Sequence, residues 1–200
     1  MTGARYTVLA TQGTSPGIVA ELVYNILNGR VEELPSRGTV ERVVLVATQH
    51  PLVADAARVA LSLLKCCIGY EGGAELQMAN VEDVVDRASF GVFVEKVESV
   101  LRGVEGSVVL DVTGGRVGMA LAAYIAAESV VGRGRLFVTT TQVPSERYRE
   151  LQNLFAGNRE KLVETSERVL REGCESLSAE EKELLCRLVT REAVSSVLWP

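Results

Sequence analysis

Short segments made almost entirely of apolar residues alternate with longer segments of helical spacing, and this alternation limits the folds open to the chain. The apolar segments are 6–11, 43–48, 108–112 and 136–140, with a weaker one at 75–78. Strands that are apolar on both faces are typical of parallel sheets covered by helices on both sides. We therefore predict an α/β, Rossmann-like fold whose parallel sheet has helices on both faces and the strand order 3-2-1-4-5.

Helical spacing fills the gaps between these strands and the whole C-terminal quarter of the chain. The expected helices are 18–27, 52–68, 82–104 and 119–131, with a polar loop over 30–41. From residue 145 onward apolar residues recur only at helical spacing, and Ser178 and Glu181 stand three apart as in a capping box. We predict a Rossmann-like domain over residues 1–145 and a helical C-terminal appendage over residues 146–200.

The overall composition excludes several classes of function. Hydrophobic residues make up 47% of the 200 residues, enough for a real core, while the net charge of −5 argues against DNA as a partner. No apolar run approaches the roughly 18 residues of a membrane span, and no cleavable signal precedes the first strand, so we expect a cytoplasmic protein without membrane contact. One histidine and no CxxC spacing predict neither a metal site nor a cofactor.

The chain has four cysteines, at positions 66, 67, 174 and 186. Cys66 and Cys67 lie inside an apolar helical pattern, and we interpret them as core residues. A bridge between Cys174 and Cys186 remains open, and it would fit a thermophilic source.

Two loops with the same layout follow the first and fourth predicted strands. They are "ATQGTSPGIVAEL" at 10–22 and "LDVTGGRVGMAL" at 110–121. In open α/β sheets, ligands bind beyond the carboxyl ends of the strands where the strand order reverses, and these two strands meet there. Thr-Gln also ends three strands, so we expect Gln12, Gln49 and Gln142 to line one edge of the sheet.

The first loop has two compatible interpretations. Ser15 followed by Pro16 is a good helix start, with serine as the N-cap and proline at the first position. A helix N-terminus also attracts anions, and Gly13 and Gly17 would let the backbone approach a phosphate closely.

The second loop points more directly to an anion. Gly114 and Gly115 between a strand and a helix form a nest of backbone N–H groups, and Arg116 adds a planar cation suited to phosphate. Asp111, at the end of a buried strand, is expected to brace this turn. The loop is neither a Walker A loop nor GxGxxG. An acyl-transfer triad of Ser15, His50 and Asp111 is a weaker alternative, because Ser15 lacks the G-x-S-x-G context.

"GTSPG" at 13–17 and "DVTGGR" at 111–116 resemble the two signature loops of CARF domains, the CRISPR-associated Rossmann-like ligand sensors. The chain looks most like the stand-alone ring nucleases of that group. The resemblance covers roughly residues 5–143. It implies a homodimer that binds cyclic oligoadenylate, with the tetra-adenylate as the expected ring, and helix 119–131 could form part of the dimer interface.

The resemblance also implies metal-independent cleavage of the ring to linear products with 2′,3′-cyclic phosphate ends, which would switch off type III CRISPR signalling in antiviral defence. Ser15 and Arg116 are then the catalytic residues. The ligand-binding residues would be Thr11, Gln12, Gly13, Thr14, Gln49, Thr113, Gly114, Gly115 and Gln142. Val117 stands where many relatives carry lysine, so a non-catalytic CARF sensor that signals through its helical tail is the alternative.

Overall fold

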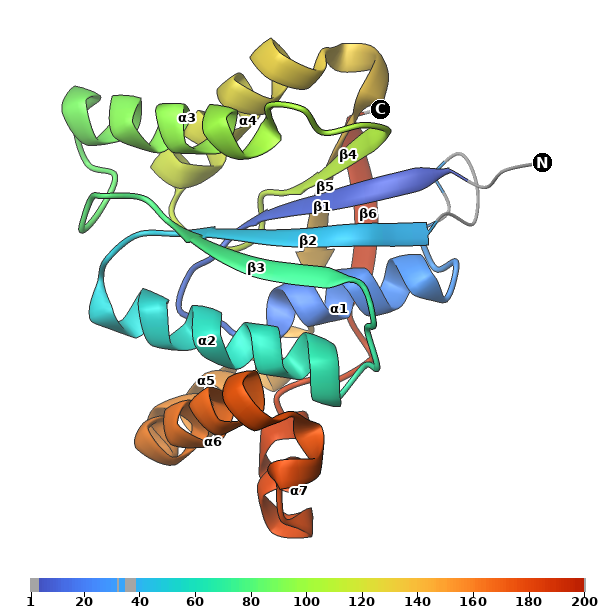
Figure 1. The fold of residues 1–200 in the computed structure, drawn as a ribbon, viewed down its shortest axis with the longest axis vertical. Coiled ribbons are helices and arrows are strands. Elements are labelled where there is room, and N and C mark those ends of the chain that lie inside the picture. The colour runs from blue at the N-terminus through green and yellow to red at the C-terminus, as the bar shows by residue number, and fades with distance from the viewer. Residues whose placement is uncertain (1–3, 32, 35–38, 200) are drawn as a thin grey trace.

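The computed structural model describes residues 4–31, 33–34 and 39–199, and it contains a six-stranded mixed sheet in the order β3-β2-β1-β4-β5-β6 (Figure 1). The strands are β1 (Arg5–Thr11), β2 (Thr39–Ala47), β3 (Gly73–Met78), β4 (Ser107–Asp111), β5 (Leu136–Gln142) and β6 (Val194–Trp199). The first five are parallel, which confirms the predicted order, and β6 runs antiparallel to β5. Part of the expected loop 30–41 lies outside the described residues, and β2 already begins at Thr39.

Helices cover both faces of the sheet, as predicted. They are α1 (Gly17–Leu27), α2 (Pro51–Cys66), α3 (Arg87–Leu101), α4 (Val117–Val131), α5 (Ser145–Gly157), α6 (Arg159–Glu172) and α7 (Ala179–Cys186), with short 3-10 turns η1 (Arg133–Arg135) and η2 (Cys174–Ser176). In Figure 1, α3 and α4 lie on one face and α1 and α2 on the other, with α6 outside α2. Neighbouring strand residues serve opposite faces, since Val8 packs toward α1 and α2 while Leu9 packs toward α3 and α4. The strands are continuously apolar for this reason.

The C-terminal region is not purely helical, because residues 194–199 form β6 at the edge of the sheet. The predicted capping box of Ser178 and Glu181 is present at the start of α7. No strand signal marks β6 in the sequence, because the buried Ser195 occupies its inner face. The Ser195 hydroxyl lies 2.9 Å from the Thr141 hydroxyl and accepts a hydrogen bond from Asn25.

Cys67 is buried in the core and Cys66 packs against it, as predicted, but Cys174 and Cys186 do not pair with each other: the disulfides are Cys66–Cys174 and Cys67–Cys186. The two adjacent cysteines end α2, where that helix meets η2 and α7, and each therefore reaches a different distant cysteine. Spacing along the chain carries no signal for such a pairing, since the partners lie 108 and 119 residues apart.

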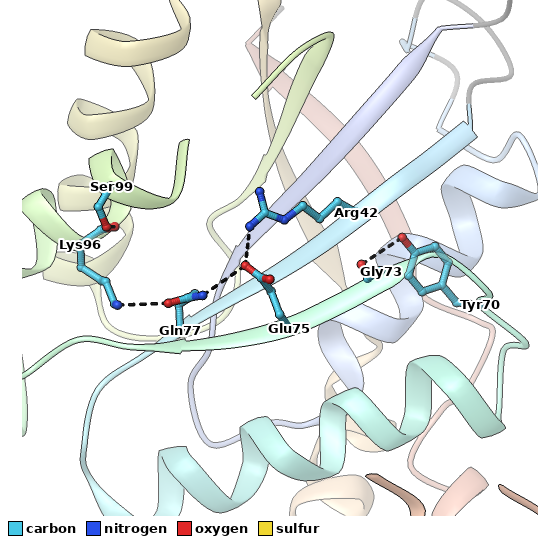
Figure 2. A network of polar contacts seen from close by, with 7 residues as sticks. All are labelled: Arg42, Tyr70, Gly73, Glu75, Gln77, Lys96 and Ser99. Carbon is cyan, nitrogen blue, oxygen red and sulfur yellow. Dashed lines mark hydrogen bonds and ion pairs between the residues drawn. The ribbon is translucent and has the colours of Figure 1, made fainter. Parts of the chain in front are cut away.

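The opposite edge of the sheet is covered by charged and polar side chains on β3 (Figure 2). Glu75 accepts hydrogen bonds from Arg42 on β2, at 2.5 Å, and from Gln77, whose own carbonyl accepts from Lys96 on α3. Such a charged edge protects the unpaired backbone groups of an edge strand from pairing with another chain. This network serves the fold and lies apart from the pocket described next.

Candidate functional site

A pocket of about 680 Å³ lies beyond the carboxyl ends of the parallel strands, between the loops that follow β1 and β4. This is the position where the strand order reverses, so the structure has a pocket where the sequence predicts a ligand site. The loops after β2, β3 and β5 complete the walls with His50, Asp83 and Gln142, among others. Five strand ends thus contribute to one concave surface.

Glycines let the two signature loops pack directly on each other. A Cβ atom on Gly13 would lie 2.5 Å from the Gly115 nitrogen, and one on Gly114 would lie 2.2 Å from the Thr11 carbonyl oxygen. The Thr11 hydroxyl also donates to the Gly114 carbonyl. Gly115 has a φ of 89°, which favours glycine. Backbone contact between the loops therefore requires these glycines, whatever ligand the loops hold.

Asp111 braces the second loop, as the sequence predicted. Its Oδ1 accepts hydrogen bonds from the Thr113 backbone N–H at 3.0 Å and from the Thr113 hydroxyl at 2.6 Å. The Thr113 hydroxyl oxygen in turn accepts from the Thr141 N–H on β5, at 2.6 Å. Burial raises the pKa of the Asp111 carboxyl to about 6, and the two bonds from Thr113 oppose that rise.

Arg116 lies at the mouth of the pocket, at the start of α4. Its guanidinium pairs with the Asp83 carboxylate at 2.7 Å, and 68% of its side chain is exposed. Free N–H groups and the helix dipole favour an anion at a helix N-terminus, and α4 begins at the pocket wall. Val117 follows directly and is 84% exposed.

The first loop departs from its predicted capping geometry. The N-cap of α1 is Pro16, with no side-chain hydrogen bond, so Ser15 is not the cap. The Ser15 hydroxyl instead lies 2.9 Å from the Tyr148 hydroxyl and accepts a hydrogen bond from Gln152, both on α5. Because α5 packs beside the loop, the Ser15 side chain turns toward it rather than back toward the helix backbone.

The residues predicted to bind ligand divide into two groups. Those that line the pocket are Gly13, Thr14, Ser15, Thr113, Gly114, Gly115, Arg116 and Gln142. Thr11 and Gln12 are buried beneath it, where Gln12 donates to the carbonyls of Gly13 and Ser15. Gln49 is exposed and lies outside the lining, so the three glutamines do not form one row. A ligand contact by any of these residues stays a prediction.

The alternative catalytic triad is not assembled. His50 Nδ1 accepts from the Leu52 N–H at the start of α2, Asp111 is bound to Thr113, and Ser15 is bound to residues of α5. Each member therefore has a separate structural task.

Asp83 and Tyr148 are among the pocket residues that sequence reasoning missed. Asp83 follows the weak strand signal of β3, in a segment that we assigned to a helix starting too early, at residue 82 rather than Arg87. Tyr148 lies one turn inside α5, and a helix following the last parallel strand was the only available hint. Across the described ranges, no helix is long and apolar enough to cross a membrane, and no group of three or more His, Cys, Asp or Glu could hold a metal ion.

The fold and this pocket define a Rossmann-like α/β protein with a pocket at the switch point of its sheet. No family model and no curated protein matches the sequence. Among solved structures, the chain resembles Enterococcus italicus Csm6 bound to cyclic hexa-2′-fluoro-hexa-dAMP, with a TM-score of 0.52 and 15% identity over 90% of this chain and 44% of that one. Can2 from Sulfobacillus thermosulfidooxidans in complex with cyclic tetra-adenylate gives a TM-score of 0.46 and 14% identity, over 92% of this chain and 57% of that one.

At 15% identity, the similarity to Csm6 concerns the fold alone. The chain therefore has a Rossmann-like α/β fold, as its strand and helix pattern predicted. Because it spans less than half of the Csm6 chain, the similarity concerns one part of that protein.

Proposed function

We propose that the pocket binds the phosphates of a cyclic oligoadenylate at a homodimer interface and that the protein cleaves the ring. The observation that carries this proposal is the convergence of both signature loops on one pocket, with Arg116 and the start of α4 at its mouth. Backbone N–H groups of a glycine nest, a helix N-terminus and an arginine are the donors that phosphate oxygens accept most favourably. The two signature loops thus offer donors of the kind that phosphate binding requires.

The size and surroundings of the pocket favour a ligand shared by two copies of the chain. A volume of about 680 Å³ fits one small-molecule ligand rather than a ring of several nucleotides. Next to Arg116, α4 exposes Val117, Leu121 and Ile125 at helical spacing, with 84%, 51% and 43% of each residue accessible. Packing of this apolar stripe against a second copy would place two pockets beside one two-fold axis.

In the proposed reaction, a ribose 2′-hydroxyl attacks the adjacent phosphorus and the bond from phosphorus to the 5′-oxygen breaks. The 2′-hydroxyl proton leaves, the 5′-oxygen gains a proton, and the products are a 2′,3′-cyclic phosphate and a 5′-hydroxyl. The protein's contribution is to hold the attacking and leaving oxygens in line and to stabilise the added negative charge. Ser15 contacts the scissile phosphate or its ribose, and Arg116 stabilises the charge after exchanging Asp83 for a phosphate oxygen.

One observation favours the alternative of a non-catalytic sensor. Val117, in the position where many ring nucleases have lysine, points into solvent and brings no second cation to the pocket mouth. Arg116 then has to carry the cationic role alone, or the ring is bound and kept intact.

Incubation of the protein with cyclic tetra-adenylate in EDTA, followed by chromatography and a separate binding titration, tests both functions. Linear products with cyclic-phosphate ends support the ring nuclease, tight binding of an intact ring supports the sensor, and absence of binding contradicts both. Arg116→Ala is expected to lower turnover by at least a hundredfold. Arg133→Ala is the matched control, because Arg133 pairs with Glu128 beyond the other end of α4. Equal activity in the two variants would show that Arg116 is not the cation.

A further inference from the structure

The Ser15 hydroxyl belongs to a chain of three side chains that joins the first signature loop to α5. From this chain we infer that Ser15 and Tyr148 act as one hydrogen-bond donor toward a ligand phosphate, and that Gln152 sets the direction of that donor. The inference rests on the proposed function, because it concerns how the same pocket recognises its anion. It also makes the C-terminal region part of the site.

Two elements bring the three residues together, because Ser15 lies in the loop after β1 while Tyr148 and Gln152 lie on α5. Ser15 and Tyr148 both line the pocket, and their hydroxyl oxygens are 2.9 Å apart. Gln152 lies behind them, in a small separate cavity that Ser15 and Tyr148 also border, and its Nε2 donates to Ser15 Oγ. Gln152 is absent from the pocket lining, so it reaches the ligand only through Ser15.

The Ser15 and Tyr148 hydroxyls together leave one proton free for a hydrogen bond to a ligand. A serine or tyrosine hydroxyl has one proton to donate, and the amide nitrogen of Gln152 only donates. The bond between Ser15 and Tyr148 uses one of the two hydroxyl protons, whichever residue gives it. The other proton is left for a partner in the pocket, so the pair presents one donor there. Gln152 donates to Ser15 Oγ from the side away from the pocket.

A phosphate oxygen is the acceptor that suits such a donor. Hydrogen bonds to charged acceptors are shorter and stronger than neutral ones, and donors fixed before the reaction are most effective where negative charge develops. No carboxylate belongs to the chain of Gln152, Ser15 and Tyr148. Arg116, paired with Asp83, and the start of α4 line the same pocket, so an anion held there would meet donors from both signature loops.

The fold fixes α5 firmly enough for this role. Tyr148 and Gln152 are four residues apart and share one face of the helix. The helix follows directly from β5 and is anchored by the buried side chain of Phe155. Close by, the Leu188 carbonyl packs so near Gly17 that a Cβ there would lie 2.3 Å from its oxygen. The region after residue 145 therefore contacts the first signature loop at several points.

A double-mutant cycle tests the inference. Ser15→Ala, Tyr148→Phe and the double variant are compared with the wild type for single-turnover cleavage of cyclic tetra-adenylate in EDTA. Each single variant keeps one hydroxyl proton but loses the partner that positions it, so each is expected to be slower by tenfold or more. The double variant is expected to be no slower than about the slower single one, because the two hydroxyls act as a unit. Rates that multiply, or a Tyr148→Phe variant as fast as the wild type, would overturn it.

Gln152→Glu tests the positioning residue. A carboxylate accepts rather than donates, so the variant is expected to slow cleavage in the wild-type background and to have little further effect when Tyr148→Phe is already present. A purely structural role would instead lower the melting temperature and slow both backgrounds equally. Tyr24→Phe is the matched hydroxyl-removing control, since Tyr24 stacks under Arg30 and Arg191 away from the pocket.

The two proposals fail in different ways. If the wild type does not bind the ring, both the proposed function and the inference are wrong. If the wild type binds the ring but leaves it intact, the same double-mutant cycle is measured with the dissociation constant of the ring. Each single variant is then expected to bind at least tenfold more weakly, and the double variant about as weakly as the weaker single one. If binding or cleavage is normal in the wild type and unchanged by Tyr148→Phe, the inference alone is wrong.

Discussion

Replacing Asp111 with asparagine is expected to change how the stability of the protein depends on pH. The Asp111 carboxyl is buried, and burial raises its pKa from 3.8 to about 6. At 1.36 kcal/mol per pH unit, this difference corresponds to about 3 kcal/mol. Asparagine keeps an oxygen that accepts from the Thr113 N–H and hydroxyl, so Asp111→Asn removes the titration while retaining the brace.

The direction of the effect follows from proton binding. Between about pH 4 and pH 6 the folded protein holds a proton on Asp111 that the unfolded chain has already released. The contribution of Asp111 to the free energy of unfolding therefore falls as the pH rises through this window. Below pH 4 both states are protonated, and above pH 6 both are ionised, so the change is confined to the window.

Urea unfolding followed by circular dichroism at several pH values between 4 and 7 measures the effect. The free energy of unfolding of Asp111→Asn minus that of the wild type is expected to increase by about 3 kcal/mol across this range. Asp86→Asn is the control, and its difference from the wild type is expected to stay nearly flat above about pH 5, because hydrogen bonds from the Ser89 backbone and side chain lower the pKa of Asp86 and its titration therefore lies largely below this range. A difference between Asp111→Asn and wild type that stays flat with pH would refute the reasoning.

Two further predictions concern the loops and the disulfides. Gly114→Ala is expected to cost about 1–3 kcal/mol in thermal unfolding, because its Cβ would overlap the Thr11 carbonyl, whereas Gly157→Ala, with nothing within 4 Å, is expected to cost nothing. Reduction of both disulfides with dithiothreitol is expected to lower the free energy of unfolding. The loop of 108 residues closed by Cys66–Cys174 accounts for about 4–5 kcal/mol of this loss. Within the total loss, opening Cys67–Cys186 while Cys66–Cys174 is still closed is expected to cost about 3 kcal/mol, because Cys66–Cys174 already holds those cysteines near each other in the unfolded chain. Equal melting temperatures for the two glycine variants, or with and without reductant, would contradict these expectations.

The sequence determined the sheet because its signals are local. A strand buried on both faces has to be apolar at every position, as at 43–47, and such segments can be recognised without knowing what they contact. The position of the site followed from the same information. Once the strand order was predicted, the loops at Gly13 and Gly114 had to meet where the order reverses, and they do.

Tertiary structure alone decided the partners of individual polar and sulfur atoms. Cys66 could not be paired with Cys174, nor Ser15 with Tyr148, because bonds across 108 and 133 residues leave no periodicity in the sequence. The strand β6 escaped prediction for a related reason, since hydrogen bonds to Thr141 and Asn25 replace the apolar contacts that would have revealed it. The sequence thus determined the layers of the fold and the location of the pocket, through burial. Packing of the C-terminal region decided which side chains surround Ser15, because only the folded chain brings those groups within hydrogen-bonding distance.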